Sequence, residues 1–137
     1  MSESIKSKCK KIKLVLTDVD GVLTDGGRYY SEKGEIVKRF HVRDGMGINI
    51  LLRNGIKTAI VTKENSKIVK KWAKEMNVSK TYSGIKNKEK ELEKICKFYK
   101  ILPDEVAFIG DDVNDIKLMK KVGFSVTPSD GILPAKK

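Results

Sequence analysis

With 137 residues, the chain is long enough to bury a hydrophobic core in one compact domain without disulfides or a structural metal. Hydrophobic residues make up 39% and charged residues 34%, and no apolar run approaches the roughly 20 residues of a membrane span, which argues against a membrane protein. The formal net charge of +11 comes mainly from lysines scattered along the chain, whereas nucleic-acid-binding proteins more often cluster arginines with aromatic residues.

The N-terminal residues 1–12 are basic and are expected to be flexible. The lysine-rich segment Lys6–Lys13 leads into only a brief apolar stretch without a small-residue cleavage site, so we expect no secretory signal and a cytoplasmic location. Cys9 and Cys96 form no metal-ligand pattern and are expected to stay reduced. Residues 1–137 are expected to form a single domain.

The stretch from Leu14 to Thr24 organises the rest of the sequence. A short apolar run ends at two aspartates separated by one residue, Asp18 and Asp20, and a glycine follows them. This pattern predicts a buried strand that delivers paired carboxylates to the edge of a sheet. Because two like charges buried close together are costly, the pair implies a bound cation, a shifted pKa, or both.

Residues 21–40 alternate turn residues with short β-prone pieces, which predicts a β-hairpin standing as a flap beside the carboxylates. The next segment, residues 41–47, is predicted to be a loop, and His41 is interpreted as an ordinary loop histidine because it is the only histidine of the chain. A helix capped by Asp44 should follow. The apolar residues on one face of this helix are expected to be Met46, Ile50 and Leu51.

Further along the chain, short buried strands alternate with helical patterns. Strands are expected at 57–61, 80–82, 106–109 and 124–126, and helices at 65–76, 87–99 and 114–122. This alternation predicts an α/β fold of the Rossmann-like kind, with a mainly parallel sheet, helices on both faces, and ligands at the carboxyl ends of the strands. Lys88 would stand in the first turn of its helix, where a cation opposes the helix dipole, so it is expected to have another role.

Polar residues follow three of the expected strands and should therefore meet at one edge of the sheet. They are Asp18 and Asp20 after the first strand, Thr62 after the second, and Asp111 and Asp112 after the strand at 106–109. Carboxylate oxygens without histidine or cysteine suit Mg²⁺ better than zinc. A Mg²⁺ ion held by carboxylates is usually partnered by substrate phosphate, so the sequence predicts phosphoryl-transfer chemistry.

Each of these residues has a possible role in such a reaction. Asp18 can attack phosphorus to form an aspartyl-phosphate, and Asp20 can protonate the leaving group and later deprotonate the attacking water. The Thr62 hydroxyl and the Lys88 ammonium would hold phosphate oxygens, and Asp111 would complete the metal site. Taken singly, each also has a structural reading, since Thr62 can cap a strand end and Lys88 can be one of many surface lysines.

Taken together and in this order, the four motifs resemble the signature of the haloacid dehalogenase-like (HAD) phosphohydrolases, from about Lys13 to Pro128. The resemblance implies that Asp18 is the nucleophile and Asp20 the acid/base, with both in contact with Mg²⁺. It also implies that Asp111 is a direct metal ligand and Asp112 a ligand or a group behind the ligands. Asn114 and Asp115 would support the site, Asp115 by orienting Lys88 or a metal-bound water.

The intervals between the motifs are already filled by the hairpin and by single helices, which leaves no room for a separate cap domain. A second set of residues resembles the capless 3-deoxy-D-manno-octulosonate 8-phosphate (KDO 8-phosphate) phosphatases: Tyr30, Gly34-Glu35, Lys38, Phe40, Arg43-Asp44-Gly45, Gly47-Ile48 and Gly84. This resemblance implies a small phosphorylated sugar acid as substrate, with eight or nine carbons and contacts from Arg43, Thr62 and Lys88. It further implies a homo-oligomer, typically a tetramer, whose neighbours cover the site.

The chain departs from that family at two places. The family usually has Thr-Gly-Arg at the second motif, whereas this chain has Thr62 followed by Lys63 and Glu64. Lys63 adds positive charge near the phosphate, and Glu64 resembles the branch that acts on nine-carbon acids, so both are expected to contact the substrate. Family members also continue past the region of Phe124–Pro128 with a basic tail, and we expect weaker covering of the site where that tail is missing.

Two other functions compete with a Mg²⁺-dependent phosphatase. The divergent second motif and the short tail would suit a HAD-fold binding or assembly module that has little activity. Net charge alone would suit a nucleic-acid-binding protein. The complete set of catalytic residues argues against the first alternative, and the scattered lysines and missing aromatic platform argue against the second.

Overall fold

The computed structural model describes residues 4–111 and 113–129 and has a five-stranded parallel sheet at its centre. The strand order is β5-β4-β1-β6-β7. The strands are β1 (Leu14–Thr17), β4 (Lys57–Val61), β5 (Lys80–Tyr82), β6 (Val106–Ile109) and β7 (Phe124–Val126). The predicted α/β architecture is confirmed, and β1, which carries the first motif, is the central strand.

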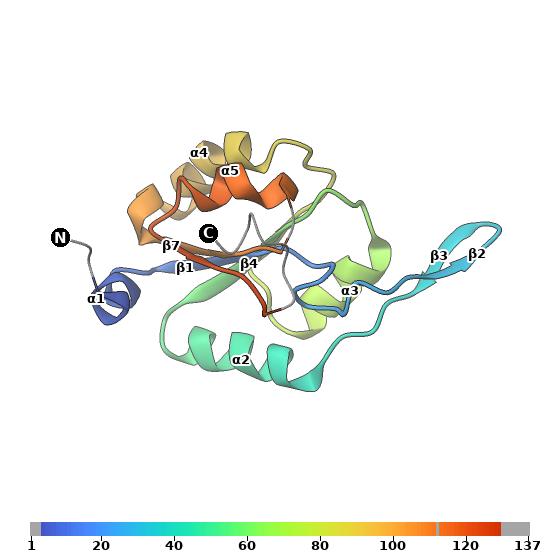
Figure 1. Ribbon diagram of the computed structural model, residues 1–137. Coiled ribbons are helices and arrows are strands. Elements are labelled where there is room, and N and C mark those ends of the chain that lie inside the picture. The colour runs from blue at the N-terminus through green and yellow to red at the C-terminus, as the bar shows by residue number, and fades with distance from the viewer. Residues whose placement is uncertain (1–3, 112, 130–137) are drawn as a thin grey trace.

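Helices cover both faces of this sheet, as Figure 1 shows. They are α2 (Val42–Arg53), α3 (Lys67–Glu75), α4 (Lys88–Tyr99) and α5 (Ile116–Met119), with short 3₁₀ turns η1 (Pro103–Glu105) and η2 (Val113–Asp115). The helices α4 and α5 lie on one face, and α2 and α3 lie on the other. Within the ranges given above, no helix combines the length and the apolar character that crossing a membrane requires.

Alternate residues of the central strands enter two separate hydrophobic clusters. On the side of α4 and α5, Leu14 and Leu16 pack with Ile95 and Phe108. On the opposite side, residues such as Ile60 pack against α3. Burial on both faces explains why these strands are continuously apolar instead of alternating, as is typical of parallel sheets.

The predicted hairpin is present and projects away from the sheet (Figure 1). It consists of β2 (Tyr29–Ser31) and β3 (Gly34–Val37), which pair antiparallel. Gly34 has φ +114°, a conformation that favours glycine at the turn. The side chains of β2 are exposed, so the hairpin contributes little to the core of its own chain.

The helix α2 begins earlier than predicted, and its buried residues are ones that the sequence pattern did not single out. It begins at Val42, because His41 caps it by accepting a hydrogen bond at Nδ1 from the Arg43 N–H at 3.0 Å. The helix turns Gly45 and Ile48 inward, and Gly45 packs so closely on Met76 that a side chain there would meet its sulfur. Of the three apolar residues expected on one face, Met46 and Ile50 are 53% and 48% exposed, whereas Leu51 is half-buried.

Near the N-terminus, Ser4 caps a short helix α1 (Ile5–Lys10), none of whose residues is buried. The helix expected at 114–122 is reduced to a 3₁₀ turn and α5. It ends early because Gly123 donates its N–H to the carbonyls of Pro103 and Val106, which draws the chain back to the sheet.

Candidate active site

The carboxyl ends of β1, β4 and β6 open into one small cavity of about 230 Å³. Asp18 follows β1 directly, Thr62 follows β4, and Asp111 lies just after β6. The full lining consists of Asp18, Asp20, Arg28, Thr62, Lys63, Glu64 and Asp111. The parallel register of the three strands thus brings together the side chains that the sequence placed at their ends.

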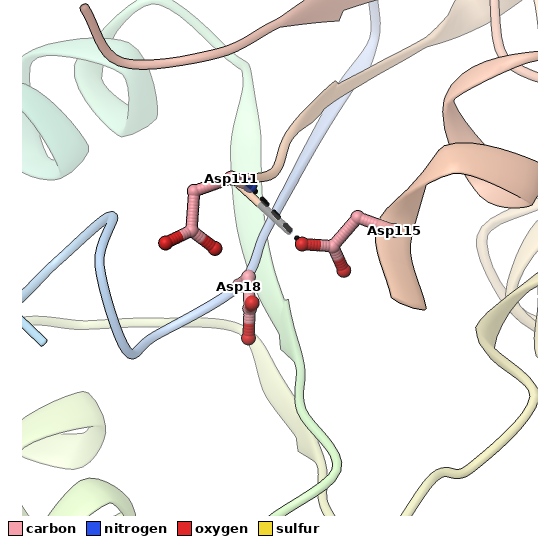
Figure 2. Close-up of side chains that lie close together, drawn as sticks. All are labelled: Asp18, Asp111 and Asp115. Atoms are coloured by element: carbon pink, nitrogen blue, oxygen red, sulfur yellow. Dashed lines mark hydrogen bonds between the residues drawn. The ribbon is translucent and has the colours of Figure 1, made fainter. Parts of the chain in front are cut away.

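Three carboxylates form a compact group (Figure 2), and two of them, Asp18 and Asp111, line this cavity. Oxygen atoms of Asp18, Asp111 and Asp115 all lie within 4.8 Å of one another. The Asp111 N–H donates to Asp115 Oδ2 at 3.1 Å, which ties two members of the group together. Two glycines permit the approach, since a side chain on Gly21 would overlap the Asp111 carboxylate and one on Gly110 would overlap Asp115.

Lys88 lies behind these carboxylates and is fully buried, with 1% of its side chain exposed. Its Nζ is 2.6 Å from Asp115 Oδ1 and 3.2 Å from Asp18 Oδ1. The ion pairs explain why a lysine begins α4 against the helix dipole. They also agree with the expectation that Asp115 orients Lys88.

The buried position of Asp18 changes its acidity. Burial raises the pKa of Asp18 to about 7, an effect that Lys88 opposes and the nearby Asp115 strengthens. The Val19 N–H donates to Asp18 Oδ1 at 2.7 Å and also favours the ionised form. Three carboxyl groups offer the hard oxygen donors that a small divalent cation such as Mg²⁺ prefers. A bound cation would also offset the burial and the nearby negative charge that disfavour the ionised form of Asp18.

The side chain of Asp20 takes a different direction from that of Asp18. Its Oδ1 accepts a hydrogen bond from Lys38 at 2.6 Å, and its Oδ2 lies 3.5 Å from Arg28. Lys38 also pairs with Glu35, and its bonds to the two carboxylates hold the pKa of Lys38 above its ordinary value although burial acts to lower it. Asp20 was expected to contact the metal, but its carboxylate lies with these cations and outside the group of three.

The second motif forms the opposite wall of the cavity. Thr62 is buried, and its hydroxyl oxygen accepts a hydrogen bond from the Glu64 N–H at 3.3 Å, so its own proton can be donated into the cavity. The Glu64 carboxylate accepts a hydrogen bond from Arg28 at 3.0 Å. Lys63 is exposed and lines the same wall.

Among the described residues, the predicted substrate contact Arg43 does not line this cavity. Arg43 lines another cavity of about 480 Å³ between the first loop and the start of α2, and so lies apart from the carboxylates within one chain. Asp112 falls outside the described residues. Asn114 belongs to η2, but the position of its side chain is not described.

Sequence reasoning missed the part that Arg28 and Lys38 take in the site. Both reach Asp20 from the hairpin segment, and no local pattern indicates that contact. For Lys38 a signal was available, because Glu35 carries the opposite charge three residues earlier and the two side chains form an ion pair. Gly21, directly after Asp20, was a signal that another group approaches the backbone closely. That group is the Asp111 carboxylate.

The close approach at Gly21 leads to a prediction about metal affinity. Gly21→Ala should weaken Mg²⁺ binding roughly 10-fold or more, because the added methyl group displaces the Asp111 carboxylate. Titration calorimetry would measure the affinity. Gly55→Ala is the matched control, since Gly55 has a similar positive φ but nothing within 4 Å of the added carbon. Equal Mg²⁺ affinity in both variants would contradict the prediction.

Comparison with known proteins identifies the family of the chain. Residues 42–123 match the family model of haloacid dehalogenase-like hydrolases. The chain is 38% identical over 130 residues to the 3-deoxy-D-manno-octulosonate 8-phosphate phosphatase KdsC of Escherichia coli K12, covering 95% of this chain and 69% of the relative. It is 34% identical to KdsC of Yersinia pestis, with 95% and 70% covered.

Solved structures give the same result. The chain resembles the cobalt-bound phosphatase of Haemophilus influenzae with a TM-score of 0.91 and 35% identity, covering 94% of this chain and 75% of that one. It resembles the Moraxella catarrhalis phosphatase, in complex with magnesium, phosphate and KDO, with a TM-score of 0.89 and 37% identity, covering 93% and 74%. The chain therefore belongs to the haloacid dehalogenase-like hydrolase family and, within it, to the group of the KDO 8-phosphate phosphatases.

Proposed function

We propose that this protein is a Mg²⁺-dependent phosphatase that hydrolyses the phosphomonoester of a 2-keto-3-deoxy sugar acid through an aspartyl-phosphate. The observation that carries the proposal is the group of carboxylates from Asp18, Asp111 and Asp115 beside a cavity that Asp20 and Thr62 also line. A nucleophile, an acid/base, a hydroxyl donor and oxygen ligands for a cation are the parts that phosphoryl transfer requires.

In the first half of the reaction, a carboxylate oxygen of Asp18 bonds to phosphorus while the bond from phosphorus to the sugar oxygen breaks. The electron pair of that bond stays on the leaving oxygen, which takes a proton from Asp20. The Thr62 hydroxyl donates to a phosphate oxygen, and Lys88 acts from behind by favouring the ionised form of Asp18 against the effect of burial. The products of this half are the free sugar acid and phosphorylated Asp18.

In the second half, Asp20 accepts a proton from a water molecule whose oxygen bonds to phosphorus, and the bond from phosphorus to Asp18 breaks. Phosphate leaves, and both aspartates return to their starting states. Asp18 and Asp111 would hold Mg²⁺, with Asp115 and Lys88 supporting them and Asp112 and Asn114 completing the surroundings. When bound, the ion supplies positive charge that offsets the repulsion between the phosphate and the nucleophile.

The substrate class rests on the named relatives and on the second motif. KDO 8-phosphate is the first candidate, because the relatives are phosphatases of that compound. A nine-carbon nonulosonate 9-phosphate is the second, because Glu64 stands where the eight-carbon group usually has arginine. Glu64 and Lys63 line the cavity and are proposed to contact the sugar acid beyond its phosphate.

A homo-oligomer, most simply a tetramer, is part of the proposal. Val42, Met46 and Ile50 form an exposed apolar stripe at helical spacing on α2. The adjoining cavity contains Arg43, whose proposed contact with the substrate therefore requires a neighbouring copy. We further propose that residues 1–137 act as one domain in the cytoplasm, which the unpaired thiols of Cys9 and Cys96 support.

The decisive experiment measures phosphate release from a panel of sugar phosphates that includes KDO 8-phosphate and a nonulosonate 9-phosphate. Release should occur with Mg²⁺ and disappear when the metal is removed by a chelator. The ratio of kcat/KM values for the two acids then identifies the substrate. Tight binding without release from any member would favour the binding or assembly module, and salt-sensitive binding of arbitrary oligonucleotides would revive the nucleic-acid alternative.

A further inference from the structure

Lys38 is the most deeply buried cation on the flap side of the cavity. It follows β3 directly, and only 1% of its side chain is exposed. Its Nζ lies 2.6 Å from Asp20 Oδ1 and 3.1 Å from Glu35 Oε1. A lysine that is so completely removed from water needs both of these charged partners to offset the loss of hydration.

We propose that Lys38 is a positioning residue for the acid/base Asp20, which it orients so that Oδ2 is the oxygen that exchanges the proton with the substrate. This inference rests on the role proposed above for Asp20. The ammonium group has three hydrogen-bond donors and no acceptor, so Oδ1 must accept from it and cannot carry a proton toward it. The remaining oxygen is therefore the one available for proton transfer.

The surroundings of Asp20 agree with this division between its two oxygens. Arg28 lies 3.5 Å from Oδ2, beyond ordinary hydrogen-bond distance, and its side chain is 36% exposed and lines the cavity. Lys38, in contrast, is buried and at short range. Oδ1 is thus fixed by a strong charge-assisted bond, whereas Oδ2 borders on a group that can move when a substrate enters.

The backbone on both sides of Lys38 is anchored, which gives the contact its rigidity. On one side, β3 is paired with β2 and supplies Glu35. On the other side, Phe40 stacks on Trp72 of α3 with ring centroids 4.3 Å apart and an interplanar angle of 9°. Lys38 therefore couples the hairpin to the acid/base through an ion pair whose lysine is buried.

A comparison of two leaving groups tests the proposal. A sugar alkoxide needs a proton from Asp20 as it departs, whereas p-nitrophenolate is stable enough to leave without one. Lys38→Met should therefore lower kcat/KM for the sugar phosphate by roughly 10²-fold but for p-nitrophenyl phosphate by less than about 10-fold. Lys33→Met is the matched control, because Lys33 lies in the exposed turn of the same hairpin, and both rates should remain near native.

An equal loss on both substrates would show that Lys38 serves only the structure, and would overturn the proposal. Asp20→Asn in the same assay separates this failure from that of the proposed function. If Asp20→Asn also affects both substrates equally, the acid role of Asp20 is wrong. If it is selective while Lys38→Met is not, only the inference about Lys38 fails.

Lys38→Met alone can fail to fold if it leaves the Asp20 carboxylate without its cation. The double variant Asp20→Asn/Lys38→Met removes that carboxylate as well, so it keeps the test valid. If Lys38 acts through Asp20, adding Lys38→Met to Asp20→Asn should not change sugar-phosphate hydrolysis by more than about 2-fold. A further loss as large as that of a single variant in the native background would contradict the inference.

Discussion

Asp18→Asn should lower the rate of phosphate release by roughly 10³- to 10⁶-fold, the range expected when a nucleophile is removed. An amide cannot form the phosphorylated intermediate, and Asp18 belongs to the carboxylate group and lines the cavity together with Asp20. Steady-state phosphate release with saturating Mg²⁺ measures the loss. Mass spectrometry of rapidly quenched enzyme should detect one added phosphoryl group on the native chain and none on the variant.

Asp25→Asn is the control for this substitution. Asp25 is exposed, and its carboxylate caps only the Gly27 N–H at 2.9 Å, so the same change of charge there should leave the rate within about 2-fold of native. Activity retained in Asp18→Asn would refute the nucleophile assignment, whatever the control shows.

Lys88→Met should lower the free energy of unfolding by about 3 to 5 kcal/mol, because it leaves the Asp115 and Asp18 carboxylates buried without their shared cation. Without Lys88, the pKa of Asp18 would rise further, since the lysine is the main influence that lowers it. Activity should therefore fall together with stability. Urea denaturation of the metal-free protein measures the free energy, and added Mg²⁺ should recover part of the loss.

Lys90→Met tests whether burial of the charge is the cause. Lys90 also lies in the first turn of α4 but is exposed, so its replacement should change the free energy of unfolding by less than about 0.5 kcal/mol. A similarly small change in Lys88→Met would mean that the carboxylate group does not depend on its cation.

The sequence was sufficient for those parts of the site that follow from strand order. Asp18, Thr62 and Asp111 stand at the ends of apolar strands, and parallel pairing alone brings such positions to one edge. The unfavourable place of Lys88 in its helix likewise indicated a distant partner, which is Asp115. In both cases the local sequence pattern was sufficient, because it makes sense only if the residue contacts a distant part of the chain.

Other features depend on contacts between segments that no local pattern connects. The sequence did not identify the buried face of α2, because helical spacing fits both the exposed stripe of Met46 and Ile50 and the inward pair of Gly45 and Ile48. Only the close contact of Gly45 with Met76 decides between them. In the same way, the direction of Asp20 depends on Lys38, which arrives from the far end of the hairpin.

The strand order also determines when the site can form during folding. Leu14 of β1 pairs on one side with Lys57 and on the other with Val106, so the central strand acquires both neighbours only after nearly the whole chain is present. Contacts so distant in sequence form late and slow the folding of parallel sheets. A nascent or truncated chain that lacks β6 therefore has neither Asp111 nor Asp115 beside Asp18, and Mg²⁺ affinity can serve as a probe of complete folding.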